Sequence, residues 1–135
     1  MKDDYELLAD DGNPFHQLLG PVYHRPDVEG MGYRWQVRRQ HLNQLSILHG
    51  GALAALLDIT MGSSVHQLAP VPADFLTASL NIDFVGPTRE GDWLDIVVVL
   101  PKSGRKLSFV RCEVRSGDQL IAQASGVWFA RGSRA

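Results

Sequence analysis

The chain has 135 residues, of which 44% are hydrophobic, and this length and composition suit one globular domain over residues 1–135. Its formal net charge of −2 argues against a general nucleic-acid-binding protein, which would carry a basic surplus. No run of about 18 apolar residues occurs, so we expect no transmembrane helix and no membrane partner.

The cysteine and histidine content argues against disulfides and metal sites. Cys112 has no second cysteine with which to pair, and the acidic segment MKDDYELLADDG (1–12) lacks the apolar core of a secretory signal. We therefore expect a cytoplasmic protein. The five histidines form no close pair and no HExxH motif, and no Walker loop or GxGxxG fingerprint occurs, so we expect no metal and no separate cofactor.

The first part of the chain predicts short elements. Residues 1–19 predict a helical lead-in, which consists of a short acidic helix, a break at DGNP and a second short helix around FHQLLG. Residues 21–25 predict a short strand. Residues 31–40 alternate Tyr33, Trp35 and Val37 with polar side chains, which is the period of a half-buried strand.

The second part predicts one long helix and a strand meander. From residue 51 to about residue 66 or 68 the chain is apolar almost all round, which indicates a buried helix, and APVPAD ends it. Four strand-like segments follow, 75–85, 92–100, 105–115 and 119–130, with short turns that imply antiparallel neighbours. Together these elements predict an α+β fold, in which a curved antiparallel sheet of five to six strands wraps around one long central helix.

A spaced set of residues extends from the loop before this helix to the strand after it: Asn43, His49, Gly50, Gly51, Asp58, Thr77 and the segment NIDFVGP (81–87). In this set, and over about residues 14–130, the chain resembles the hotdog-fold acyl-CoA thioesterases of the phenylacetyl-CoA thioesterase (PaaI-like) type. The resemblance implies hydrolysis of a small or medium acyl- or aryl-CoA to free acid and CoA by a homodimer or a dimer of dimers, that is, a homotetramer. Coenzyme A is then part of the substrate.

The resemblance also implies a role for each residue. The backbone amide of Gly50 would polarise the thioester carbonyl, and Asp58 would act as nucleophile or general base, with Thr77 beside it. Asn43 would hold the attacking water, and His49 would orient the thioester. The remaining implied contacts with substrate fall on Gly51 and on the segment GRKLSF, through Gly104 and Arg105.

Elementary chemistry supports the role of Gly50. The first N–H groups of a helix have no internal acceptor, and the helix dipole concentrates positive charge there. Because glycine has no Cβ, a ligand can approach its backbone closely. The Gly50 amide could thus act as a one-donor oxyanion hole, a contribution of roughly 3 to 4 kcal/mol. In the alternative, Gly50 and Gly51 only form the corner between loop and helix, or a close packing contact.

Asp58 places a carboxylate in the wall of an apolar helix, where it is costly without a partner or a cavity. An ionised carboxylate can attack a thioester or take a proton from water, and both routes are compatible with these residues. The alternative is a structural carboxylate that caps a loop or pairs with Arg34 or Arg38.

The spacing of Gly50 and Asp58 decides how they could act together. Eight residues of helix correspond to about 12 Å along its axis, too far for one carbonyl to contact both groups. If both act on one thioester, they come from different chains. Two antiparallel copies of the helix about a two-fold axis would place each N-terminus beside the other's middle, so the spacing predicts a homodimer with two sites in the interface.

The other polar residues have open alternatives. The Thr77 hydroxyl could hold Asp58 or a water, or simply belong to a strand. Asn43 could bind a water or brace its loop. His49 could position the substrate or act as an acid near neutral pH, or it could cap the helix or donate to a backbone carbonyl. Arg105 could hold CoA phosphates at a pocket rim or lie at a solvated hairpin tip.

Three other functions fit the fold: an acyl-CoA-binding regulator without activity, a hydratase or dehydratase, and a structural dimerisation module. A pure binder needs no carboxylate near the thioester, which argues against the first. The second would require a histidine paired with an acidic residue at the reacting carbons, a motif that we do not find. The leading hypothesis is therefore an acyl-CoA thioesterase.

Overall fold

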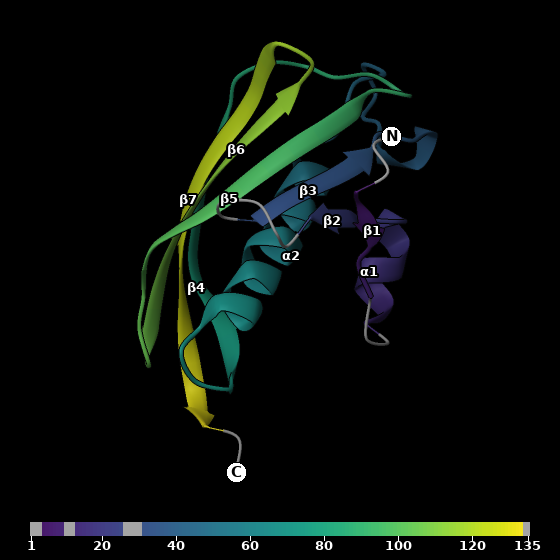
Figure 1. Ribbon diagram of the computed structural model, residues 1–135. Coiled ribbons are helices and arrows are strands. Elements are labelled where there is room, and N and C mark those ends of the chain that lie inside the picture. The colour runs from purple at the N-terminus through teal and green to yellow at the C-terminus, as the bar shows by residue number, and fades with distance from the viewer. Residues whose placement is uncertain (1–3, 10–12, 26–30, 134–135) are drawn as a thin grey trace.

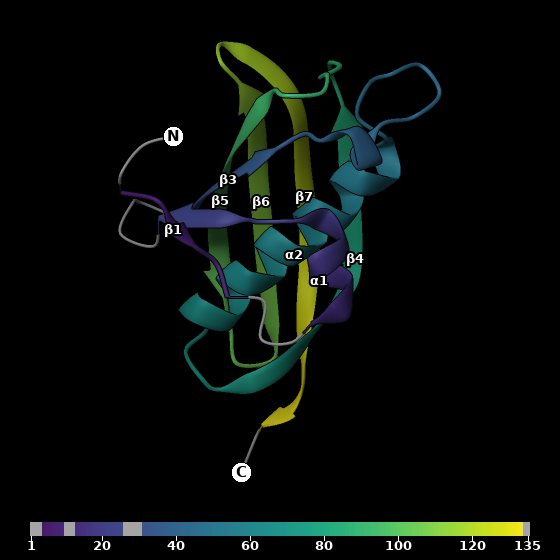
Figure 2. The ribbon, with the colours of Figure 1, turned by 90° about the vertical axis from the view of Figure 1, so that its right-hand side faces the viewer.

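The computed structural model describes residues 4–9, 13–25 and 31–133. Its elements follow in this order: β1 (Glu6–Leu7), α1 (Pro14–Leu19), β2 (Tyr23–Arg25), β3 (Met31–Gln36), a 3₁₀ turn (Arg39–His41), α2 (Gly50–Leu68), β4 (Ala73–Phe84), β5 (Trp93–Ser103), β6 (Leu107–Ser116) and β7 (Gln119–Ser133). The sheet curves around α2, and α1 lies on the far side of that helix from β6 and β7 (Figures 1 and 2).

The strands form one antiparallel sheet in the order β1-β2-β3-β5-β6-β7-β4. The predicted α+β hotdog fold is confirmed, with seven strands in place of five to six. The additional strand is β1, which lies in the segment predicted as an acidic helix. That prediction is wrong for Glu6 and Leu7, because they pair with His24 and Tyr23 of β2 and this sheet contact overrides a weak helical preference. Residues 1–3 and 10–12 of the same lead-in lie outside the described residues.

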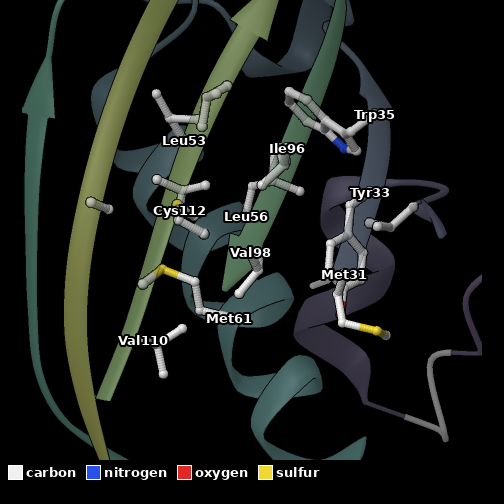
Figure 3. Packing of buried hydrophobic residues seen from close by; sticks show 14 of the residues in the cluster. Met31, Tyr33, Trp35, Leu53, Leu56, Met61, Ile96, Val98, Val110 and Cys112 are labelled. Carbon is white, nitrogen blue, oxygen red and sulfur yellow. The ribbon is translucent and has the colours of Figure 1, made fainter. Parts of the chain in front are cut away.

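The long helix α2 is the centre of the hydrophobic core. Its buried side chains pack against the concave face of the sheet, and each fully buried leucine contributes about 1.5 to 3 kcal/mol. Figure 3 shows this packing between α2 (Leu53, Leu56, Met61), β3 (Met31, Tyr33, Trp35), β5 (Ile96, Val98) and β6 (Val110, Cys112). Neither α1 nor α2, the helices in the described ranges, is long and apolar enough to span a membrane.

Strand β4 lies at one edge of the sheet and pairs, within the described chain, only with β7. A bulge between Thr77 and Ser79 shifts its register. Before the bulge Thr77 faces α2, and after it Leu80, Ile82 and Phe84 do so. Because Thr77 and Phe84 are an odd number of positions apart, a regular strand would point them to opposite faces. The bulge therefore lets both ends of β4 face the helix.

Candidate active site

The start of α2 leaves one backbone donor free. His49 is the N-cap residue, and its carbonyl accepts the N–H groups of Ala52 and Leu53 at 3.0 and 3.1 Å. The N–H of Gly51 donates to Nδ1 of the His49 ring at 2.8 Å. Among the described residues, the N–H of Gly50 has no acceptor. With the helix dipole behind it, this amide is suited to an anionic oxygen.

The exposed ring of His49 adds a second donor at the same helix end. Because Nδ1 accepts a hydrogen bond from Gly51, the ring proton of the neutral side chain is on Nε2. A Cβ on Gly51 would lie 3.0 Å from Nδ1, so glycine allows the ring to fold back over the backbone. The His49 side chain therefore caps the helix and keeps an N–H group for a ligand. The Gly51 amide, by contrast, is occupied by this cap.

Asn43 closes the loop that leads into the helix. Its Oδ1 accepts the N–H groups of Leu45 and Ile47 at 2.9 and 3.4 Å, and its backbone N–H donates to the carbonyl of Ile47 at 2.8 Å. The side-chain oxygen is thus engaged in bracing the loop. The side-chain NH₂ has no partner in the described part of the chain, and it is the group through which Asn43 could hold a water.

His41 supports the same loop from inside, although sequence reasoning assigned it no role. Its ring is buried, 3% exposed, with its centroid 4.3 Å from that of Trp35, and its Nδ1 accepts the N–H of Arg38 at 2.9 Å. Its carbonyl accepts the N–H of His49 at 2.8 Å, which fixes the helix cap. Burial lowers the pKa of His41, so its ring is neutral. A single histidine eight residues before His49 gives no periodic signal that could reveal this contact.

Asp58 lies further along α2, half-buried, with one hydrogen-bond donor among the residues that the structure describes. The Thr77 hydroxyl of β4 donates to its Oδ1 at 2.6 Å. Arg34, one of the two cations considered as a structural partner, instead pairs with Asp95 at 2.6 Å. Within the described ranges no cation forms an ion pair with Asp58. The second carboxylate oxygen is therefore available to a substrate or a water.

The two groups lie at separate places within one chain. Residues 50–68 form one continuous helix, so Gly50 and Asp58 are about 12 Å apart along its axis. Strand β4 runs back along the helix, with Thr77 beside Asp58 and Phe84 beside Gly50. One chain thus carries two half-sites, an amide half at Gly50 and a carboxylate half at Asp58.

The predicted CoA-side residues lie in the hairpin between β5 and β6. The N–H of Gly104 donates to the carbonyl of Leu107 at 2.8 Å, and a Cβ at this glycine would lie 2.8 Å from the same oxygen, so the turn itself requires glycine. Arg105 is exposed. Leu107 pairs with Phe129 of β7, which pairs with Leu76 of β4. The hairpin therefore lies at the end of the sheet where β4 begins, on the side of the carboxylate half (Figure 1).

No group of three or more metal-ligating side chains occurs within the described ranges. Cys112 is buried, and burial raises the pKa of its thiol to about 12. A thiol with so high a pKa is almost wholly protonated at neutral pH, which makes it a poor nucleophile. The groups that remain as candidates for catalysis are therefore those of the two half-sites, the Gly50 amide and the Asp58 carboxylate.

The fold is that of the hotdog class, as the resemblance implied, and comparison with known proteins identifies the family. Residues 45–122 match the family model of the thioesterase superfamily. The chain belongs to this superfamily, and the expectation of a thioester hydrolase is confirmed at the level of the family.

Individual relatives agree with this assignment. Protein PA0474 of Pseudomonas aeruginosa, which bears the name of an esterase, is 32% identical over 117 residues, 86% of this chain and 87% of that one. Acyl-coenzyme A thioesterase 13 of Mus musculus is 29% identical over 90 residues, and the match spans 65% of this chain and 64% of the mouse protein. The Escherichia coli PaaI structure has the same fold, with a TM-score of 0.80 and 21% identity over 91% of this chain and 88% of that one.

Proposed function

We propose that the protein hydrolyses acyl-CoA thioesters and that each active site is completed by a second copy of the chain. The observation that carries the proposal is the separation of the two half-sites. The free Gly50 amide and the Asp58–Thr77 pair are about 12 Å apart along one helix, so one carbonyl cannot contact both. A second copy supplies the missing half.

The open edge of β4 supports this arrangement. An edge strand offers unpaired N–H and C=O groups to another strand. Its helix-facing side chains Leu80 and Ile82 are partly exposed, and a second copy would cover them. Antiparallel pairing of β4 with its copy would bring the Thr77 end of one strand toward the Phe84 end of the other. Each Gly50 amide would then face the Asp58 of the other chain, and two-fold symmetry would make the two sites equivalent.

In this site, the thioester carbonyl oxygen accepts a hydrogen bond from the Gly50 N–H, with the His49 Nε2–H as a second donor at the same helix end. The Asp58 carboxylate of the other chain either attacks the carbonyl carbon or removes a proton from the water that attacks it. Thr77 holds one carboxylate oxygen and so directs the other. The carbon–sulfur bond breaks, and CoA leaves as a thiolate that takes up a proton. When Asp58 attacks, the acyl group stays on it as an anhydride, which a water then hydrolyses to release the free acid; when water attacks, the free acid forms directly.

The CoA portion is held by the chain that supplies Asp58. The β5–β6 hairpin lies on the side of the carboxylate half, and Arg105 at its tip is exposed. A guanidinium group at the rim of a site is suited to phosphate oxygens. The substrate would thus run from Arg105, past Thr77 and Asp58, to the Gly50 amide of the other chain.

A free-thiol assay with short, medium and aromatic acyl-CoAs tests the proposal. We expect thiol release by the wild-type protein and a loss of at least about 100-fold in kcat for Asp58→Asn, because the general base or nucleophile is removed. Asp83→Asn is the matched control, because this carboxylate lies on the same strand as Thr77 but is bonded to Gln123 on the outer face. Binding of CoA without turnover would reject hydrolysis in favour of a regulator.

A further inference from the structure

The aromatic ring of Phe84 packs over the first glycine of α2. A Cβ on Gly50 would lie 3.5 Å from Cε1 and 3.6 Å from Cζ of Phe84, so the ring is in van der Waals range of this backbone position. The side chain is nevertheless 58% exposed. Phe84 therefore contributes little to the core, and its exposed ring lies beside Gly50, the residue with the free amide.

This placement depends on the bulge in β4. Thr77 must face α2 to hold Asp58, and in a regular strand Phe84 would then face away from the helix. The bulge between Thr77 and Ser79 reverses the alternation once, which brings Phe84 to the helix side. Because of this bulge, β4 places the Thr77 hydroxyl at the carboxylate half and the Phe84 ring at the amide half.

A carbonyl oxygen that accepts the Gly50 N–H lies about 3 Å from that nitrogen. The carbonyl carbon then lies next to the Gly50 backbone, over which the Phe84 ring packs, so a group attached to that carbon is within reach of the ring. In the proposed site, CoA approaches from the Arg105 side of the other chain, so the sulfur points toward the carboxylate half. The acyl group is left to contact Phe84, which belongs to the same chain as Gly50.

Resting on the proposed function, we infer that Phe84 is a specificity-determining residue, whose ring contacts the acyl group next to the reacting carbonyl. It favours acyl groups with apolar bulk at that position over acetyl, because an aromatic ring gains contact area and ring–ring packing from such groups. The substrate class of the enzyme is accordingly acyl-CoA with an alkyl or aryl group beyond the acetyl unit.

The test compares kcat/KM for acetyl-CoA, hexanoyl-CoA and phenylacetyl-CoA. We expect Phe84→Ala to lower the preference for hexanoyl-CoA and phenylacetyl-CoA over acetyl-CoA by roughly tenfold, which is the usual scale for a lost apolar contact. Phe84→Tyr keeps the ring and should keep the preference. Phe109→Ala is the matched control, since this phenylalanine is 43% exposed on the outer face of the sheet and should leave the ratios unchanged.

The possible failures are distinguishable. A wild-type protein that hydrolyses none of the three substrates overturns the proposed function, and the assignment of Phe84 with it. Hydrolysis by the wild type, with equal losses for all three substrates or no loss in Phe84→Ala, leaves the function standing and overturns the assignment. Should Phe84→Ala fail to fold, Phe84→Leu provides the same comparison for phenylacetyl-CoA against hexanoyl-CoA, because it removes the ring and keeps apolar bulk.

Discussion

At the scale of single residues, the N-cap His49 determines which donor is free. Its ring accepts the Gly51 N–H and its carbonyl accepts those of Ala52 and Leu53, which leaves the Gly50 N–H without an acceptor in the described chain. The proposed oxyanion donor is thus a backbone group, which most substitutions do not remove. Proline is the exception, because it has no N–H.

We predict that Gly50→Pro lowers kcat by about 100- to 1,000-fold, the usual effect of losing an oxyanion donor. Proline is well tolerated at the first position of a helix, and His49 has φ −67° and ψ 132°, an extended conformation that suits the residue before proline. The fold should therefore persist, which circular dichroism and size-exclusion chromatography can verify alongside the thiol-release assay.

Gly50→Ala provides the control for this substitution. It keeps the N–H, and its Cβ would meet Phe84 at an ordinary contact distance of 3.5 Å. We expect it to retain most of the activity. Equal activity in the proline variant and the wild type would show that the Gly50 amide is not the donor.

At the scale of elements, the loop from Arg38 to His49 sets the direction in which α2 begins. Asn43 closes its tip, Leu42 and Leu48 form a bridge across it, and the carbonyl of His41 holds the N–H of His49. The buried ring of His41 accepts the N–H of Arg38, which anchors the loop to the end of β3. Protonation of this ring would replace an acceptor by a donor and break that anchor.

This buried histidine predicts a dependence of stability on pH. Burial lowers the pKa of His41 in the folded chain, so the unfolded chain takes up this proton at a higher pH, near the ordinary value of about 6.5. The contribution of His41 to the free energy of unfolding is therefore present above about pH 6.5 and is lost as the pH falls toward the lower pKa of the folded state.

Urea denaturation of the wild type and His41→Gln at several pH values between about 8 and 5 would check this. The wild type should lose more stability on acidification than the variant, because only the wild type carries the buried imidazole of residue 41. Parallel curves for the two proteins would contradict the assignment.

Local sequence patterns predicted some of the secondary-structure elements and missed others. The long apolar run of the helix and the strand-like segments from 75 onward, which short turns separate, give clear signals in the sequence, and their existence is confirmed. Strand β1 could not be recognised, because two residues carry no period and form a strand only through pairing with β2. The bulge after Thr77 has no signature in the sequence either. The position of Phe84 over Gly50, which depends on this bulge, was therefore not predicted.

Some features of the candidate site could likewise be predicted from the sequence, and others could not. Helical geometry alone predicts the separation of Gly50 and Asp58. The hydrogen bond from Thr77 to Asp58 was one of the alternatives that the sequence left open for this hydroxyl. The cap formed by the His49 ring was likewise one of several alternatives. The support from His41 depends on long-range burial against Trp35, which no local pattern encodes.

At the scale of the whole molecule, each chain carries two half-sites that it cannot join into one active site. Gly50→Pro damages only the amide half, and Asp58→Asn only the carboxylate half. Each variant alone should be nearly inactive in every site. In a dimer with one chain of each kind, one of the two sites receives both defects, and the other receives an intact amide from one chain and an intact carboxylate from the other.

The most direct measurement is therefore thiol release after the two inactive variants are mixed and allowed to exchange subunits. Random exchange makes half of the dimers mixed, each with one intact site, so we predict recovery of about a quarter of the wild-type kcat per chain. Native mass spectrometry of differently tagged chains would verify that exchange has occurred. Verified exchange with no recovery of activity would contradict the shared site.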